Sequence, residues 1–142
     1  MSFVEITNAA LQTVATNQNV LFSETPVAGS RCIVHRQGSG IVTLRGLTNQ
    51  CRARYRVNFG GNIAVPDGGT AGAISVAIAV DGEPLPASTA IVTPAAVAEF
   101  FNVSIDTFVD VPCGCCVTVS VQNTSDQDIS VQNANLIAQR VC

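Results

Sequence analysis

Apolar and polar positions alternate most regularly between Gly40 and Phe59, where two β-rich segments flank a short polar break. After the break, one face of the pattern carries Cys51, Ala53, Tyr55, Val57 and Phe59. The other face carries Arg52, Arg54 and Arg56. Because side chains of a strand point alternately to opposite sides, this pattern predicts a strand with one apolar and one cationic face. Three like charges on one face repel, so they should meet acids, a partner or a subunit interface. The alternative is a solvated outer face.

Further strand patterns follow, separated by turn residues. The clearest run over residues 19–24, 31–37, 71–80, 101–111, 116–122 and 129–141. Gly60-Gly61-Asn62 and Pro66–Gly69 predict turns with positive φ angles. Asp81-Gly82 is the favoured two-residue hairpin turn. Roughly eight to ten short strands with closely spaced turn signals predict an all-β sandwich or barrel. We expect one domain over residues 19–142, with residues 1–18 as an N-terminal arm or first strand.

The composition favours association with other protein surfaces. Of 142 residues, 47% are apolar and 12% are charged, about half the usual charged share. No apolar run approaches the ~18 residues that span a bilayer, so we expect no membrane insertion. The chain has no lysine, its net charge is −3 and its pI is near 4.8, which does not favour nucleic-acid binding. An apolar surplus with few charges predicts burial against other subunits.

The first residues, MSFVEITN, lack a basic region followed by an apolar core. We therefore expect no secretory signal peptide and synthesis in the cytoplasm. Two sequences match the glycosylation motif, Asn102-Val103-Ser104 and Asn123-Thr124-Ser125. Without export, the motif has little weight.

The order of strands resembles that of the C1q/TNF-like jelly roll, and in particular its bacterial and phage branch, which includes the C-terminal domains of exosporium collagen-like proteins. The similar segments are Gly46–Val57, Ile74–Gly82, Val109–Gly114, Val117–Asn123 and Asn133–Val141. Together they cover most of the chain from about Asn19 onward. The chain departs from the family in having no Gly-X-Y stalk, few aromatic residues and six cysteines. The resemblance implies a two-sheet jelly roll of about eight to ten strands that assembles as a homotrimer around a three-fold axis. Arg52, Arg54, Arg56 and the neighbouring Tyr55 are then candidate residues of a trimer interface or an ion-pair face.

The cysteines form the second candidate group: Cys32, Cys51, Cys113, Cys115, Cys116 and Cys142. An even number permits disulfides, but six cysteines allow 15 pairings, and buried thiols are the equally favoured alternative. Zinc sites usually combine two spaced pairs of ligands. The spacing here is C-x-C-C and the single histidine, His35, is distant in sequence. We therefore predict no metal and no cofactor.

No pattern of a catalytic site is present. His35 lies in a strand pattern and no serine has a G-x-S-x-G setting. Asp106 and Asp110 lie four residues apart on one strand face. We expect them to meet the arginine face across the sheet, and Ca²⁺ binding at the trimer axis is the alternative. The sequence therefore predicts a non-enzymatic structural protein.

The predicted role is that of a trimeric surface decoration protein, of the auxiliary or cement type, on a phage capsid. It would be assembled in the host cytoplasm and displayed on the virion surface. Its partners would be itself and the major capsid protein or another particle surface. The alternative is the tip of a phage fibre or spore-surface filament that binds a host glycan or receptor. Such a tip would use loops 66–70 and 82–88 at one end of the sandwich.

Overall fold

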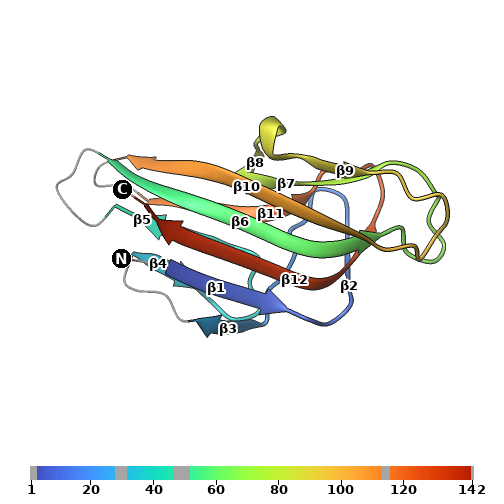
Figure 1. Ribbon diagram of the computed structural model, residues 1–142, viewed down its shortest axis with the longest axis horizontal. Coiled ribbons are helices and arrows are strands. Elements are labelled where there is room, and N and C mark those ends of the chain that lie inside the picture. Colours follow the sequence, from blue (N-terminus) through green and yellow to red (C-terminus); the bar gives the residue numbers. More distant parts are fainter. Residues whose placement is uncertain (1–2, 28–31, 47–51, 113–115, 142) are drawn as a thin grey trace.

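Two six-stranded antiparallel sheets pack face to face in the computed structural model, which describes residues 3–27, 32–46, 52–112 and 116–141 (Figure 1). Sheet A has the order β10 (Phe101–Pro112), β6 (Arg52–Ala64), β12 (Ile129–Arg140), β1 (Phe3–Asn8) and β3 (Glu24–Val27), with β2 (Gln12–Val14) pairing with β12. Sheet B has the order β4 (Ile33–His35), β5 (Val42–Arg45), β11 (Cys116–Asn123), β7 (Ile74–Val80) and β8 (Glu83–Pro84), with β9 (Ala90–Val92) pairing with β7. The helical content of the described residues is one 3₁₀ turn, η1 (Pro86–Ser88). The predicted all-β jelly-roll sandwich is confirmed.

The core lies between the sheets and consists of the inward side chains that strand alternation supplies. Tyr55, Phe59, Leu136 and Ile78 are fully buried there. Phe22 is also buried, although it lies outside the strands in the segment that leads to β3. Residues 19–24 were predicted to form a strand. Instead Asn19 makes one isolated bridge to Gln122, and β3 begins at Glu24.

The two β-rich segments around the polar break belong to different sheets: β5 lies in sheet B and β6 in sheet A. Strand β6 is longer than predicted and runs through Gly60-Gly61-Asn62, so the predicted turn there is wrong. The reason is close packing. A Cβ atom on Gly61 would lie 3.2 Å from the ring of Phe59 and 3.4 Å from the Cα of Ala134. Gly61 therefore admits the neighbouring strand, and the segment continues β6 without a turn.

The predicted hairpin turn at Asp81-Gly82 is confirmed. Asp81 has a φ of 52° and Gly82 a φ of 85°, and the turn joins β7 to β8 with Val80 facing Glu83. This turn follows β7, whereas the loop over residues 66–70 precedes it. The two loops therefore lie beyond opposite ends of β7, and the expectation that they share one end of the sandwich is wrong.

The N-terminal segment belongs to sheet A. Strand β1 lies between β12 and β3, and β2 pairs with the start of β12. Strand β12 contains a bulge at Asn133, where φ is 58° and the register with β6 shifts. The described residues form twelve strands, more than the roughly eight to ten expected, because β2, β8 and β9 are too short to give a sequence pattern.

Candidate functional site: the outer face of sheet A

The outer face of sheet A carries the arginines that the sequence pattern placed on one side of a strand. Along β6, Arg54 and Arg56 point outward and are exposed, while Tyr55 and Val57 are fully buried. Arg52 is the first residue of β6 and faces Pro112 of β10. Its side chain lies outside the described part of the structure. The alternation along β6 therefore follows the predicted pattern.

Two aspartates of β10 bind these arginines. Arg54 faces Asp110 directly in the register, and its Nε and Nη2 donate hydrogen bonds to Oδ1 at 2.7 Å and Oδ2 at 3.1 Å. Arg56 reaches diagonally to Asp106, with Nε 3.0 Å from Oδ1 and Nη2 contacting Oδ2. Two-point pairing of this kind fixes the planar guanidinium groups against the sheet. The positive charges of Arg54 and Arg56 are therefore balanced by two aspartates of the same chain.

The ion pair between Arg56 and Asp106 changes the protonation of both groups. Hydrogen bonds from Arg56 hold the pKa of the Asp106 carboxyl below its ordinary value, although burial acts in the opposite direction. The same hydrogen bonds raise the pKa of Arg56. Both groups are therefore charged at neutral pH, and the pair remains accessible to solvent and salt.

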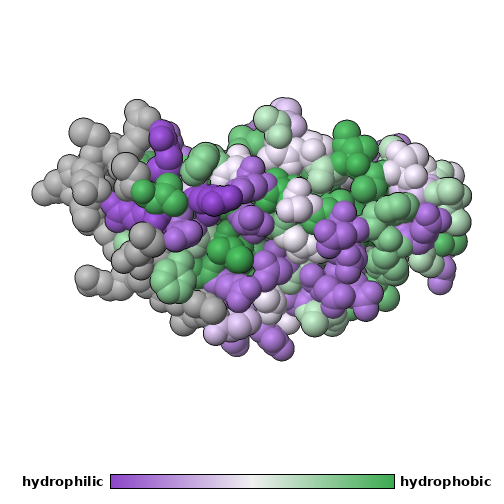
Figure 2. Space-filling model, viewed as in Figure 1, coloured by the Kyte–Doolittle hydropathy of each residue, from purple (hydrophilic) through white to green (hydrophobic). Residues whose placement is uncertain are grey.

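Exposed apolar side chains lie between and beside the ion pairs. Phe108 of β10, at 60% the most exposed large apolar side chain of this face, directly faces Arg56. The same row continues across the sheet through Gln139 to Phe3, and Ile137 of β12 lies one row further along. A shallow depression of about 210 Å³ is lined by Arg56, Asn58, Ile137 and Gln139. Figure 2 shows this face, with apolar and hydrophilic side chains intermixed over β10, β6 and β12.

Tyr55, grouped with the arginines at the sequence level, lies on the other side of β6 in the core. Its hydroxyl donates a hydrogen bond of 2.6 Å to the carbonyl oxygen of Arg45, so the side chain of β6 in sheet A is tied to β5 in sheet B. Burial, with a further contribution from Cys32, raises the pKa of Tyr55. Tyr55 therefore packs on the inner side of the strand that carries the arginines. Its predicted participation in a subunit interface stays a prediction.

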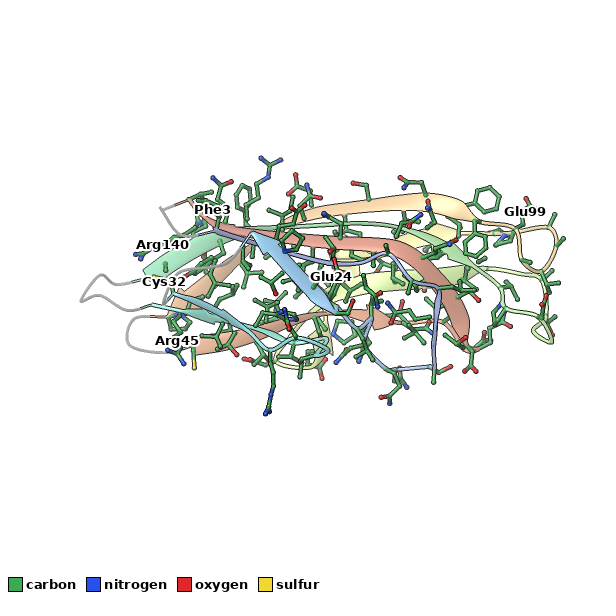
Figure 3. All side chains as sticks on the ribbon, turned by 90° about the horizontal axis from the view of Figure 1, so that it is seen from below. Phe3, Glu24, Cys32, Arg45, Glu99 and Arg140 are labelled. Carbon is green, nitrogen blue, oxygen red and sulfur yellow. The ribbon has the colours of Figure 1, made fainter. Side chains whose placement is uncertain are left out.

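Two of the six cysteines are described. Cys32 is half-buried before β4, with its Sγ 4.0 Å from Nη1 of Arg140, and both residues lie at the same end of the sandwich (Figure 3). Cys116 is exposed at the start of β11 and is in no disulfide. Arg45 faces Cys116 on one side and donates its N–H to Cys32 on the other. The two cysteines are thus two strand spacings apart, about 10 Å, beyond the ~7 Å Cα separation that a disulfide spans. Cys51, Cys113, Cys115 and Cys142 lie outside the described residues, so their pairing stays a prediction.

His35 has a structural environment. Its Nδ1 lies 3.2 Å from the hydroxyl of Thr25 and its Nε2 lies 3.0 Å from the carbonyl oxygen of Ser39. The ring thus joins β3 to the turn between β4 and β5.

Within the described ranges, no three His, Cys, Asp or Glu side chains are grouped to hold a metal ion. Among those same residues, no helix has the length and apolar character to cross a membrane.

The sandwich and its topology define a C1q/TNF-like jelly roll. Over its whole length the chain is similar to the globular domain of zebrafish complement 1qA protein, with 7% identity, 98% of that chain covered and a TM-score of 0.60. It is also similar to Eiger TNF from S. frugiperda, with 10% identity, all of this chain and 94% of that chain covered and a TM-score of 0.66. Murine APRIL, solved at pH 5.0, matches 97% of this chain over 98% of its own, with 11% identity and a TM-score of 0.60. No protein-family model and no curated protein matches the sequence. These likenesses establish the fold.

Proposed function

We propose that the chain is a non-enzymatic structural protein that assembles as a homotrimer through the outer face of sheet A. The observation that carries the proposal is the combination of exposed Phe108, Ile137 and Phe3 with arginines already paired inside the chain. A buried ion is costly when it lacks a partner, and here each described arginine of the face brings its own. The face can therefore be covered by another subunit without an uncompensated charge. The C1q/TNF-like fold supports three-fold assembly, which the sequence resemblance also implies.

A three-fold ring uses a heterologous contact, in which the face of one protomer meets a different surface of the next. Phe108 lies on the edge strand of sheet A, since β10 is the last strand in the sheet order. An exposed aromatic side chain on an edge strand can reach a neighbouring subunit. Aromatic residues of this kind often provide the largest part of the binding free energy of an interface. Phe108 is therefore the residue on which the proposal can be tested most sharply.

The proposed assembly is tested by light scattering on a sizing column. A trimer has three times the chain mass of 14.7 kDa. We expect this mass for the wild type and for a control variant, Val34→Ser, which removes an exposed apolar side chain from sheet B. We expect Phe108→Ser to shift the protein to the mass of one chain. A monomeric wild type, or an unchanged mass for Phe108→Ser, argues against assembly through this face.

We further propose that the trimer decorates a larger particle, with the exterior of a phage capsid as the first candidate and a spore surface as the alternative. The scarcity of charge and the apolar surplus of the chain support permanent docking. The test is co-sedimentation of the purified protein with undecorated capsids. Saturable binding supports the proposal, and absence of binding at micromolar concentration counts against it.

A glycan- or receptor-binding tip is the second candidate. Loops 66–70 and 82–88 were predicted to form one binding surface, but the topology separates the two loops. The end of the sandwich that holds loop 66–70 therefore forms a surface without loop 82–88.

A further inference from the structure

A second exposed apolar surface lies at the end of the sandwich where β9 leads into β10. We call it the β9–β10 patch, and it consists of Ile91, Val97, Phe100 and Phe101. Ile91, at 67%, is the most exposed large apolar side chain among the described residues. Phe3, at the start of β1, lies at the opposite end of the molecule from Glu99, which is a neighbour of the patch (Figure 3). The patch therefore lies at the opposite end of the molecule from Phe3, although Phe101 is the first residue of β10 in sheet A.

Hydrogen bonds join three loops into one surface at this end. The N–H of Ala98 donates to the carbonyl oxygen of Val65 at 2.7 Å, which ties the loop of the patch to the end of β6. The side chain of Gln127 binds both the N–H and the carbonyl of Thr70, at 3.1 and 2.8 Å, and so ties the turn between β11 and β12 to the loop after β6. Ala98 has a φ of 59°, an unfavourable angle that persists only where the surroundings hold it. The apolar side chains are thus presented on a fixed scaffold.

The charge around the β9–β10 patch has one sign. Glu99 lies within the loop, Asp67 lies two residues after Val65, and Asp126 and Asp128 flank Gln127; all four are exposed. Between Val57 and Gln139 the chain has no arginine or lysine. The labelled arginines, Arg45 and Arg140, lie at the other end of the molecule from Glu99 (Figure 3). The patch therefore has an apolar centre and an acidic border.

We propose that the β9–β10 patch docks a segment of another protein that is both apolar and cationic. An interface combines an apolar centre with a polar rim, and opposite charges at the rim accelerate and select the encounter. The acidic border disfavours nucleic acid and anionic lipid. It disfavours a second copy of this chain less strongly, but Arg54 and Arg56 already bind aspartates of their own chain. A separate basic protein is thus the occupant that the charges favour.

The proposal is tested by fluorescence anisotropy with the full chain and three short labelled peptides, composed of leucine and lysine, serine and lysine, or leucine and glutamate. We expect the leucine–lysine peptide to bind most tightly, with an affinity that falls as salt is added. The double variant Ile91→Ser/Val97→Ser should weaken binding at least about tenfold, the loss expected when two partly buried apolar side chains are removed from a contact. The double variant Asp67→Lys/Glu99→Lys should weaken it as well and reduce its salt dependence.

The matched control is Val34→Ser/Ile41→Ser, which removes two exposed apolar side chains from the region of β4 and β5 and should leave peptide binding unchanged. Equal binding of the serine–lysine peptide, or equal binding by all variants, overturns the proposal. Binding to phosphatidylcholine vesicles that is lost in Ile91→Ser/Val97→Ser overturns it in favour of a lipid surface. A second copy of the chain is the occupant if the solution mass of the wild type rises above that of the trimer as its concentration is raised, and if Ile91→Ser/Val97→Ser restores the trimer mass. That result overturns the proposal. Because none of these substitutions lies on sheet A, failure here leaves the trimer proposal intact.

Discussion

The two faces of sheet A place very different chemistry on neighbouring residues of the same strand. On the inner face of β6, Tyr55, Val57 and Phe59 are inaccessible to solvent. On the outer face, Arg54 and Arg56 are about half exposed and bind aspartates of β10. Burial of apolar area stabilises the fold by about 25 cal/mol per Å², whereas an exposed ion pair contributes about 0–1 kcal/mol. The inner face therefore holds the sandwich together, and the outer face is available for recognition.

The sharpest test of this comparison truncates one aromatic side chain on each face. Tyr55→Ala should lower the free energy of unfolding by about 3–5 kcal/mol, because it leaves a cavity and an unpaired carbonyl at Arg45. Phe108→Ala should change it by less than about 0.5 kcal/mol in the monomer. Urea unfolding at low protein concentration, followed by circular dichroism, gives both values. Tyrosine fluorescence is unsuitable, since Tyr55 is the only tyrosine and there is no tryptophan.

A large loss of stability in monomeric Phe108→Ala would contradict this division of roles. It would show that the outer face is part of the core of a single chain. A small loss in Tyr55→Ala would show that the two sheets are held together elsewhere. The solution mass of each variant, measured alongside, separates effects on assembly from effects on folding.

The next largest loss of stability is expected from the removal of a buried polar side chain. Asn123 at the end of β11 is fully buried, and its Nδ2 donates to the carbonyl oxygens of Val14 and Gln127, each at 2.9 Å. Its Oδ1 accepts the N–H of Ser125 at 2.9 Å. Asn123→Ala should cost about 2–4 kcal/mol of stability, because it leaves these partners unsatisfied. Ser130→Ala, at a buried polar position of β12, is the comparison in the same assay, and an equal or larger loss there would contradict the special role of Asn123.

Asn123 also shows where the sequence is ambiguous. Asn102 and Asn123 both begin a glycosylation motif, yet Asn102 is exposed and Asn123 is enclosed with both of its Nδ2 hydrogens used. A three-residue motif contains no information on burial.

The strand alternation of β6 was predictable, because successive side chains of a strand point to opposite faces of the sheet. The turn proposed at Gly60-Gly61 failed because glycine serves both turns and close strand contacts.

The two candidate surfaces also differ in how far the sequence predicts them. The arginine face could be predicted because its residues lie on one strand, and the aspartates because they lie on another with the same period. The β9–β10 patch was not predicted. Its residues follow β9 without a regular period, and its acidic border comes from three loops that are distant in sequence. Such a surface is formed by topology, and the single available signal was the absence of cationic residues between Val57 and Gln139.

A smaller effect is expected from removing one oxygen atom from the inner face. Tyr55→Phe keeps the packing of the ring but deletes the hydrogen bond of 2.6 Å to the carbonyl oxygen of Arg45. The expected loss is about 1–2 kcal/mol, well below that of Tyr55→Ala. Urea unfolding of the two variants side by side measures the difference. Equal losses would show that the hydroxyl, and not the ring, is what joins the sheets.

The smallest expected change in stability comes from the ion pair on the outer face, and its size depends on pH. Arg56 holds the pKa of Asp106 below the unfolded-state value of about 3.9. A carboxyl whose folded pKa is lowered stabilises the protein above its unfolded pKa, and this contribution is lost as the pH falls through the folded pKa. Asp106→Asn should therefore be slightly less stable than the wild type near neutral pH, and the difference should begin to shrink below about pH 4 and vanish as the pH falls through the lowered folded pKa. Unfolding curves at several pH values, at low salt, measure the difference. In the background of Arg56→Gln, Asp106→Asn should show a much weaker dependence on pH, since the hydrogen bonds that lower the pKa are absent. If the difference persists unchanged in that background, the pair is not its cause, and the outer face is stabilised by Asp106 through another contact.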